Sequence, residues 1–160
     1  MKQYTAIVVL MILIGLSSCN AIIEPNKGTV EKTNVEIEYL NGYFPRNDIF
    51  FETETMHIII TNRDDFDNYF GIAKTMNNII SEIDFNENHV VGILTKPSDE
   101  PMVVSIQNAV ANKHILTVYY KTVTMEKQSF TSSDIKIFQI PKTINSVHFS
   151  SEKGMIKIDK

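Results

Sequence analysis

Short stretches in which apolar and polar residues alternate recur along most of this chain. A side-chain period of two is typical of a half-buried β-strand. The clearest pair, "MVVSIQNAV" and "HILTVYYKTV", is joined across Ala111-Asn112-Lys113, which predicts a β-hairpin. The alternation places four residues of the first arm on one face: Val104, Ile106, Asn108 and Val110. In the second arm, Leu116, Val118 and Tyr120 share one face.

The same pattern predicts further strands. They are expected over Val35–Leu40, over Thr55–Thr61, from about His89 to Thr95, and in "IKIFQIP" and "SVHFS" near the end of the chain. In the strand over Val35–Leu40, Val35, Ile37 and Tyr39 alternate with two glutamates, so one face is expected to be buried.

One segment has a helical period instead. In "TNRDDFDNYFGIAKTM", apolar residues stand at i, i+3, i+4 and i+7, and either Thr61 or Asn62 can cap the first turn. We expect a helix from about Arg63 to Lys74 or Met76. About seven strands and one early helix indicate a mainly β, α+β fold, mostly antiparallel, built as a barrel or a small sandwich.

The first 18 residues have the layout of a lipoprotein signal peptide. Lys2 precedes an apolar run from Ala6 to Leu16, which is shorter than the roughly 20 residues that a membrane-spanning helix needs. Leu16-Ser17-Ser18-Cys19 resembles the bacterial lipobox, in which the cysteine thiol receives a diacylglycerol before cleavage. Cys19 is the single cysteine in the sequence, and we predict that it is the lipidation site.

The remaining chain has the length of one domain. Residues 19–34 lack sustained periodicity and contain Pro25 and Gly28, so we expect a tether there and a single β-rich domain over residues 35–160. The net charge is −4 and basic residues do not cluster, which argues against a nucleic-acid partner. The predicted location is the bacterial cell envelope, with the protein lipid-anchored to the outer membrane on its periplasmic or surface face.

No catalytic or metal-binding motif stands out in the sequence. The four histidines, at positions 57, 89, 114 and 148, are scattered, whereas metal sites usually include a closely spaced pair. The chain lacks the G-x-S-x-G nucleophile elbow and a glycine-rich phosphate loop. We therefore predict that the protein is not an enzyme and uses no metal or cofactor, although carboxylates that are distant in sequence are not excluded as a catalytic pair.

Two short stretches are candidates for binding a partner. "LNGYFPRND" places Tyr43, Phe44 and Arg46 in a turn, where the aromatic side chains either form a recognition patch or fold back as a lid on the core. "KPSDEP" carries Lys96, Asp99 and Glu100 between two prolines, which reduce the entropy lost on binding. The second stretch is alternatively an ordinary charged loop.

Several segments resemble a known family. "ITNRDDFDNYFGIA", "IDFNENHVVGIL", "EKQSF", "IFQIPK" and "VHF" resemble small Bacteroidetes-type lipoproteins that are similar in layout to the C-terminal domain of the protease-complex subunit PrcB. The resemblance covers about residues 56–149. PrcB-type sequences commonly carry a Gly-Gly-Tyr-like segment where this chain has Asp99-Glu100-Pro101-Met102. The resemblance implies a non-catalytic β-rich module associated with proteases.

The sequence thus leaves two functional hypotheses. The first is a lipid-anchored module that binds a secreted or surface protease, in one form as a peptidase inhibitor. The alternative is an accessory lipoprotein that binds glycans or surface polymers. Aromatic side chains on an open face would favour glycans, whereas an ordered protruding loop would favour a protease partner.

Overall fold

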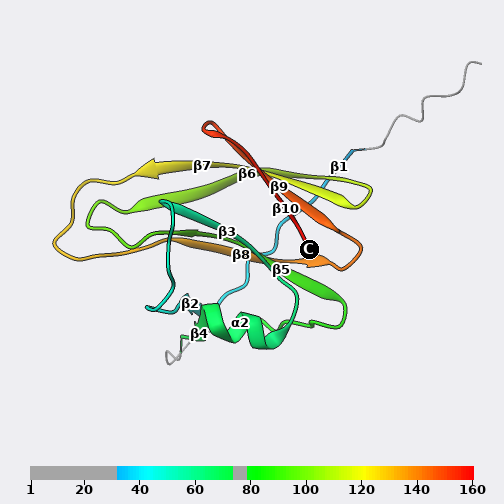
Figure 1. Cartoon of the computed structure of the whole chain (residues 1–160), viewed down its shortest axis with the longest axis horizontal. Coiled ribbons are helices and arrows are strands. Elements are labelled where there is room, and N and C mark those ends of the chain that lie inside the picture. The colour runs from blue at the N-terminus through cyan, green and yellow to red at the C-terminus, as the bar shows by residue number, and fades with distance from the viewer. Residues whose placement is uncertain (1–31, 74–78) are drawn as a thin grey trace, which may run out of the picture.

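The computed structural model describes residues 32–73 and 79–160, which form ten strands and one helix (Figure 1). The elements in chain order are β1 Thr33–Asn34, β2 Tyr43–Pro45, β3 Thr55–Ile60, α2 Arg63–Tyr69, β4 Phe70–Ile72, β5 Asn88–Thr95, β6 Met102–Asn112, β7 Ile115–Thr124, β8 Ile135–Pro141, β9 Ser146–Ser151 and β10 Gly154–Asp159. The prediction of a mainly β fold with one early helix is confirmed, with more strands than the seven expected.

The elements form three layers. The outer sheet has the strand order β1-β6-β7-β9-β10, and the middle sheet has the order β3-β5-β8. The third layer contains α2 and the two-stranded sheet β2-β4, on the side of the middle sheet that faces away from the outer sheet (Figure 1). All described pairings are antiparallel except β7 with β9, which is parallel.

The middle sheet is buried on both faces, and strand β5 shows why. Its last seven residues are all buried, and such a continuous apolar run is typical of a strand covered on both sides. Val91 and Ile93 belong to the core between the outer and middle sheets, whereas Val90 and Leu94 belong to the core beneath α2. Because successive side chains of a strand point to opposite faces, β5 contributes residues to both cores.

The helix is shorter than predicted. Asn62 caps it by accepting a hydrogen bond from the Asp65 backbone amide (2.9 Å), but α2 ends at Tyr69, and Phe70 has extended backbone angles. Residues 70–72 pair with β2 as strand β4, with Gly71 opposite Phe44. A Cβ atom at Gly71 would lie 2.6 Å from the Phe44 ring, so glycine permits the close approach. Strand pairing thus replaces helical hydrogen bonds after Tyr69.

The predicted strand over Val35–Leu40 is not formed. The segment crosses from one sheet to the other: the Val35 amide donates to Ala109 in β6, and the Leu40 amide donates to Ile137 in β8. Only Tyr39 forms a β-bridge, with Phe138. The alternation still places Val35 and Ile37 against the core, but a crossing segment has no continuous neighbour with which to form a ladder.

The β6–β7 hairpin is confirmed, with two corrections. Its turn is Lys113-His114, because Asn112 pairs with Ile115, and Lys113 has a positive φ of 53°. A β-bulge between Ile106 and Asn108 also reverses the side-chain order of β6. After the bulge, the inward-facing residues are Ala109 and Ala111 instead of the predicted Asn108 and Val110.

Two further segments differ from expectation or lie outside the described residues. Strand β10 was not predicted, and it pairs with β9 across a turn that ends at Gly154. Thr33 and Asn34, expected at the end of the tether, form β1 against β6. The predicted signal peptide, the predicted lipidation site Cys19 and residues 19–31 of the tether lie outside the described residues.

Candidate functional site: an edge cleft and a sheet-face hollow

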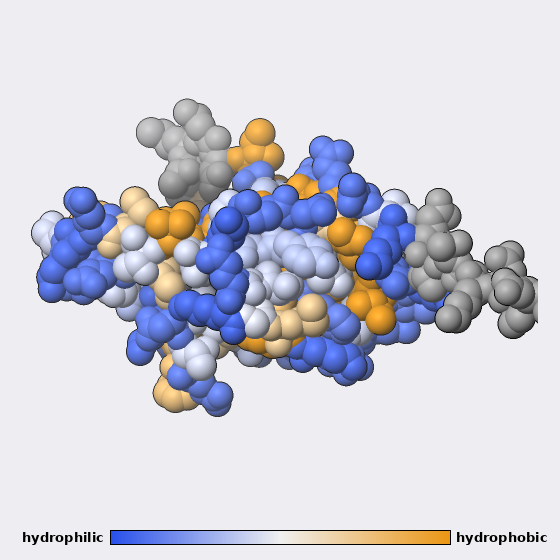
Figure 2. All heavy atoms as spheres, turned by 90° about the horizontal axis from the view of Figure 1, so that it is seen from above, coloured by the Kyte–Doolittle hydropathy of each residue, from blue (hydrophilic) through white to orange (hydrophobic). Residues whose placement is uncertain are grey.

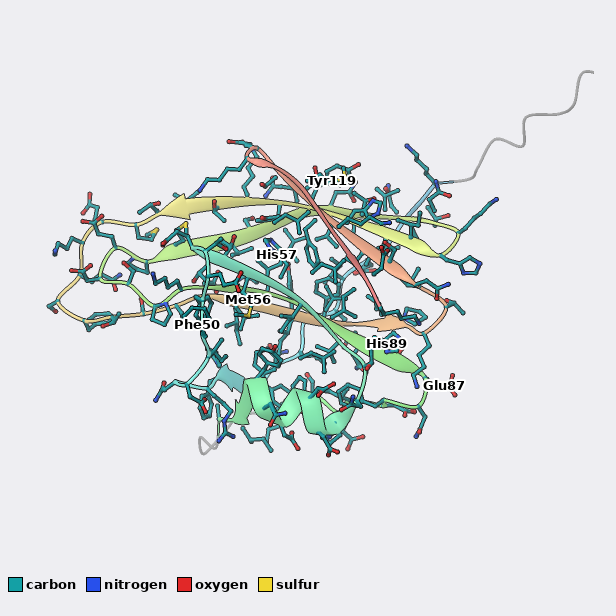
Figure 3. The ribbon with its side chains drawn as sticks, in the orientation of Figure 1. Phe50, Met56, His57, Glu87, His89 and Tyr119 are labelled. Atoms are coloured by element: carbon teal, nitrogen blue, oxygen red, sulfur yellow. The ribbon has the colours of Figure 1, made fainter. Side chains whose placement is uncertain are left out.

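A cleft of about 310 Å³ opens where the outer and middle sheets meet at one side of the sandwich. We call it the edge cleft, and its lining comes from the segment before β3, from β3 and from β10: Phe50, Glu52, Thr53, Thr55, Met56, His57, Ile156 and Ile158. Phe50 is 78% exposed and Ile156 is 45% exposed. Figure 3 shows Phe50, Met56 and His57 on the same side of the molecule. The cleft thus combines an interior histidine with exposed apolar side chains.

Both strands that flank the edge cleft are the last strands of their sheets. In an antiparallel pair, residues whose backbone groups face the partner alternate with residues whose groups face away. The Lys160 amide donates to Asn145, which continues the β10–β9 register, so the backbone groups of Met155, Lys157 and Asp159 face away from β9. They have no strand beside them in the described structure.

The same argument applies to β3. The Lys96 amide donates to the Glu54 carbonyl (2.9 Å), which continues the β3–β5 register. The backbone groups of His57 and Ile59 therefore face away from β5, toward the open side. The edge cleft consequently lies between two sheet edges that both have backbone donors and acceptors available.

His57 lies at the inner end of the edge cleft. Its Nε2 atom is 2.8 Å from the Tyr120 hydroxyl, and its ring packs against Phe149 with centroids 4.7 Å apart. Burial lowers the pKa of His57 from 6.5 to about 4, because the charged imidazolium loses hydration there. At neutral pH the imidazole is uncharged, so among the described residues Glu52 is the only charged side chain that lines this cleft.

Acid is expected to destabilise the protein through His57. In the unfolded chain His57 binds a proton below about pH 6.5, but in the folded protein only below about pH 4. The free energy of unfolding should therefore fall as pH decreases from 6.5 to 4. His57→Gln keeps a hydrogen-bonding group but does not titrate, so its denaturation midpoint should depend less on pH. Urea titrations of both proteins at pH 7 and pH 4.5 test this, and equal pH dependence would contradict it.

Histidine 89 contributes to the acid sensitivity of both proteins in that comparison. It is buried, and its Nε2 atom is 2.9 Å from the Lys160 ammonium. Burial lowers the pKa of His89, and the charges of Lys160 and Lys142 lower it further. Because this effect is common to the wild type and His57→Gln, the difference between their pH dependences of stability reports on His57 alone.

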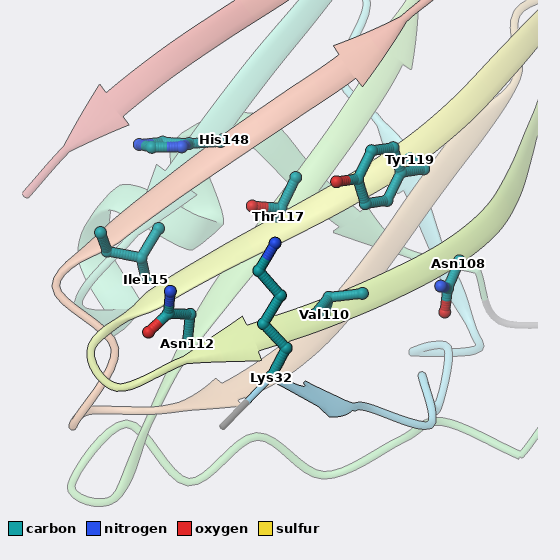
Figure 4. A pocket seen from close by; sticks show the side chains of 8 residues that line it. All are labelled: Lys32, Asn108, Val110, Asn112, Ile115, Thr117, Tyr119 and His148. Carbon is teal, nitrogen blue, oxygen red and sulfur yellow. The ribbon is translucent and has the colours of Figure 1, made fainter. Parts of the chain in front are cut away.

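A second, larger depression lies on the exposed face of the outer sheet. We call it the sheet-face hollow; its volume is about 600 Å³, and its lining is Lys32, Asn108, Val110, Asn112, Ile115, Thr117, Tyr119 and His148. Figure 4 shows that these side chains come from β6, β7 and β9, except for Lys32, which directly precedes β1. In Figure 2, which looks onto this face, side chains of intermediate hydropathy occupy the centre, with hydrophilic and hydrophobic residues around them.

The β-bulge of β6 creates the polar floor of this hollow. Without it, Asn108 would share the inward face with Val104, as the alternation predicted. With it, Asn108, Val110 and Asn112 face outward, opposite Tyr119, Thr117 and Ile115 respectively. The Gln107 side chain donates to the Ser105 hydroxyl (2.9 Å) on the other side of the irregularity. The extra residue at the bulge of β6 therefore turns Asn108, Val110 and Asn112 outward, where they line the hollow.

Within the described structure the side chains of Asn108, Asn112, Thr117 and Tyr119 have no hydrogen-bond partners, and the Nε2 atom of His148 is buried and unpaired. Buried or convergent polar groups are normally paired with one another, with backbone or with water. Tyr119 is 41% exposed and points away from the interior (Figure 3).

The first predicted partner-binding stretch is attached to α2. The Tyr43 hydroxyl donates to the Ser81 carbonyl (2.7 Å), and its ring packs edge-on against Phe66, as the core-lid alternative describes. Phe44 is 46% exposed and covers Gly71. The Arg46 guanidinium donates to the Asp67 carbonyl (3.3 Å). Of these three residues, Phe44 offers the most exposed apolar surface.

The second predicted stretch, 96–101, is held against the connection between β7 and β8. Asp99 forms an ion pair with Lys127 (2.8 Å), and its carbonyl accepts from the Gln128 amide. Lys96 pairs with Glu54 at 3.9 Å, and the Glu100 amide donates to the Ser98 hydroxyl. The described residues show no hydrogen bond or ion pair between this loop and residues 43–46, so the structure does not join the two stretches into one site.

Neither the edge cleft nor the sheet-face hollow was identified from the sequence. The four histidines do not converge, and among the described residues no three His, Cys, Asp or Glu side chains are grouped so that they could hold a metal ion. Within residues 32–73 and 79–160, no helix is long and apolar enough to cross a membrane. The one sequence signal for the hollow is the pair of asparagines, Asn108 and Asn112, on one face of the second half of β6.

Comparison with known proteins found no relative of this chain. No protein-family model, curated protein sequence or solved structure matches the chain.

Proposed function

We propose that this protein is a non-catalytic, lipid-anchored binding module that holds an extended segment of a protein partner in the edge cleft. The membrane contact is supplied by lipid on Cys19. A secreted or surface protease is the partner class to test first, because the sequence resembles protease-associated lipoproteins. In that form the protein is a peptidase inhibitor or a protease-associated subunit of the bacterial cell envelope.

The observation that carries this proposal is the pair of free sheet edges on either side of one cleft. An added strand forms backbone hydrogen bonds with an exposed edge, and alternate side chains of the added strand enter adjacent pockets. Lys157 in β10 and His57 in β3 each direct backbone groups toward the open side. An extended segment beside β10 would place every second side chain toward the cleft.

The lining of the edge cleft indicates the chemistry of that segment. Phe50 and Ile156 expose apolar surface at the cleft, which favours an apolar side chain in the partner. Glu52 carries the only charge in the lining at neutral pH, so a neighbouring basic residue in the partner is favoured. We infer a segment with a large apolar residue beside a lysine or arginine.

The test is a titration of the full-length protein, in detergent micelles, against purified secreted serine, cysteine and metalloproteases. Binding and residual peptidase activity are both measured. We expect at least one dissociation constant below about 10 μM, a binding free energy near −7 kcal/mol. Phe50→Ser combined with Ile156→Ser should weaken this complex at least tenfold, because the apolar contacts are lost.

Backbone pairing is tested separately with Lys157→Pro. The Lys157 amide faces away from β9, so proline removes a donor that the fold does not use, and edge positions of this kind tolerate proline. Binding should fall at least tenfold while the melting temperature changes little. Lys157→Ala is the matched control, because it removes the same side chain but keeps the amide, and it should bind normally.

The predicted loop provides a competing location for the same function. Asp99→Ala combined with Glu100→Ala leaves the edge cleft intact, so these substitutions should not change the affinity. Loss of binding in this variant but not in Phe50→Ser/Ile156→Ser would move the site to residues 96–101. If no protease of the panel binds below about 10 μM, the protease-partner proposal is abandoned.

A further inference from the structure

We propose that the sheet-face hollow is a binding site for a neutral saccharide chain. This inference is independent of the edge cleft, which lies at the side of the sandwich and shares no lining residue with the hollow. It assigns a place and a ligand chemistry to the glycan hypothesis, which the sequence alone could only name as an alternative. The argument rests on one aromatic ring, two amides, the local charge and the shape of the hollow.

Tyr119 supplies the stacking surface. Its side chain is 41% exposed, on the outward face of β7 at the middle of the outer sheet (Figure 4). A pyranose ring has an apolar face formed by its C–H groups, and such a face packs on an aromatic ring while the hydroxyls point outward. Tyr119 makes no hydrogen bond within the described structure, so its hydroxyl is also available to a ligand.

Two amides of β6 lie on the same face as that ring. Asn108 lies directly opposite Tyr119 in the hairpin register, and Asn112 lies four residues further along β6, opposite Ile115. Each amide offers both a donor and an acceptor, which matches the two roles of a sugar hydroxyl. Because neither side chain has a partner in the described structure, a bound saccharide would satisfy groups that the fold leaves free.

The charge of the hollow favours a neutral ligand. Among the described residues no carboxylate lines it, and the Lys32 ammonium is the one lysine or arginine charge in its lining. The chain as a whole has a net charge of −4, so a strongly anionic polymer would be repelled at longer range. Lys32 can donate hydrogen bonds to hydroxyl or ring oxygens without requiring an acidic sugar.

The dimensions fit a small number of sugar units. The volume of about 600 Å³ lies within the range of roughly 300–1,000 Å³ that is typical of ligand sites. The hollow is an open depression on a sheet face, so a polymer can continue beyond it in both directions. Val110 and Ile115 add apolar surface beside the polar groups, as an amphipathic sugar ring requires.

His148 forms the wall on the β9 side, next to Thr117 in the parallel register. Its Nε2 atom is covered by protein and has no hydrogen-bond partner. An unpaired buried nitrogen is unfavourable, but this atom is covered by protein, so the proposal rests on Tyr119, the two amides and the charge of the hollow.

The experiment is a titration of the full-length protein, in micelles of a detergent without sugar groups, with defined oligosaccharides. The neutral probes are maltohexaose, cellohexaose, xylohexaose and chitohexaose, and oligogalacturonate is the acidic probe. We expect at least one neutral probe to bind with a dissociation constant below about 1 mM, as measured by calorimetry. The same probe should shift the NMR side-chain amide signals of Asn108 and Asn112.

Two substitutions identify the site. Tyr119→Ala removes the stacking ring and Asn108→Ala removes the adjacent amide, and each should weaken binding at least tenfold. Val123→Ala is the control: Val123 lies four residues after Tyr119 on the same strand, is 58% exposed and is outside the hollow, so affinity should not change. Tyr119→Phe keeps the ring and should retain most of the affinity, which separates stacking from loss of structure.

Three results would overturn the proposal. One is the absence of binding to every neutral probe at concentrations up to about 10 mM. Another is binding that survives both Tyr119→Ala and Asn108→Ala. The third is binding confined to oligogalacturonate, which would mean that an anionic ligand contacts Lys32. None of these results bears on the edge cleft, because Phe50→Ser/Ile156→Ser leaves the hollow unchanged.

Discussion

Replacing Phe66 with alanine should lower the free energy of unfolding by about 3–5 kcal/mol, the range for large aromatic residues in well-packed cores. Phe66 is fully buried and is the buried residue of α2. Its ring contacts those of Tyr43 and Phe70, each at a centroid distance of 4.9 Å, and that of Phe85 at 5.9 Å. The substitution would leave a cavity between the helix and the middle sheet that rigid neighbours cannot fill.

Urea denaturation followed by circular dichroism measures this loss. Phe70→Ala should have a similar effect, because Phe70 is only 2% exposed. Phe130→Ala is the matched control, since Phe130 is 63% exposed, and its stability should change by less than about 0.5 kcal/mol. A loss below about 1 kcal/mol for Phe66→Ala would show that α2 is not packed on the middle sheet as described.

Replacing Asp134 with alanine should destabilise the protein by about 2–3 kcal/mol, because it leaves a buried backbone donor without a partner. The Asp134 carboxylate accepts a hydrogen bond from the Val104 amide in β6 (2.8 Å) and pairs with the Lys136 ammonium. Its own amide donates to the Thr95 hydroxyl (2.7 Å) at the end of β5. Asp134 therefore connects the outer sheet to the middle sheet.

Two variants separate the hydrogen bond from the charge. Asp134→Asn keeps an oxygen that can accept from Val104, so it should lose less stability than Asp134→Ala. Asp48→Ala removes an exposed carboxylate that is 3.8 Å from Arg46, and its effect should be below about 0.5 kcal/mol. Equal stability of Asp134→Ala and the wild type in urea denaturation would contradict the bridging role.

The sequence was sufficient to predict strands that have a strong local signal. Strands β3 and β5 lie where their apolar, β-branched runs placed them, and the β6–β7 hairpin lies where the alternation placed it, apart from its turn and the bulge in β6. The cap of α2 is Asn62, one of the two residues that the sequence offered, because capping depends on residues close in sequence. These features are local, so the residues that determine them are neighbours in the chain.

Features that depend on a distant partner were not predicted. Helix α2 ends early because Phe70 pairs with Pro45, and no local residue signals that pairing. The β-bulge near Gln107 is equally invisible to a period-two pattern, so Asn108 was placed on the wrong face. This error concealed the part of the sheet-face hollow that lies on β6, because the alternation had directed Asn108 and Val110 to the inward face.

The path of the chain between the two sheets has a consequence for folding. After β7 the chain leaves the outer sheet, adds β8 to the middle sheet and returns as β9 parallel to β7. Neither sheet is therefore a continuous piece of sequence, and the outer sheet cannot be completed until the chain has added β8 to the middle sheet. Such interleaving raises the mean sequence separation of contacts and is associated with slower folding.

A chain emerging from synthesis or export reaches β7 well before β9 is available. Until residues 146–151 dock, β7 has an open edge next to Leu116 and Val118, which are buried in the finished protein. An exposed apolar edge of this kind promotes association with other chains. Cleavage between β7 and β8 is expected to separate two halves that each lack strands of both sheets, so neither fragment should retain a stable fold on its own.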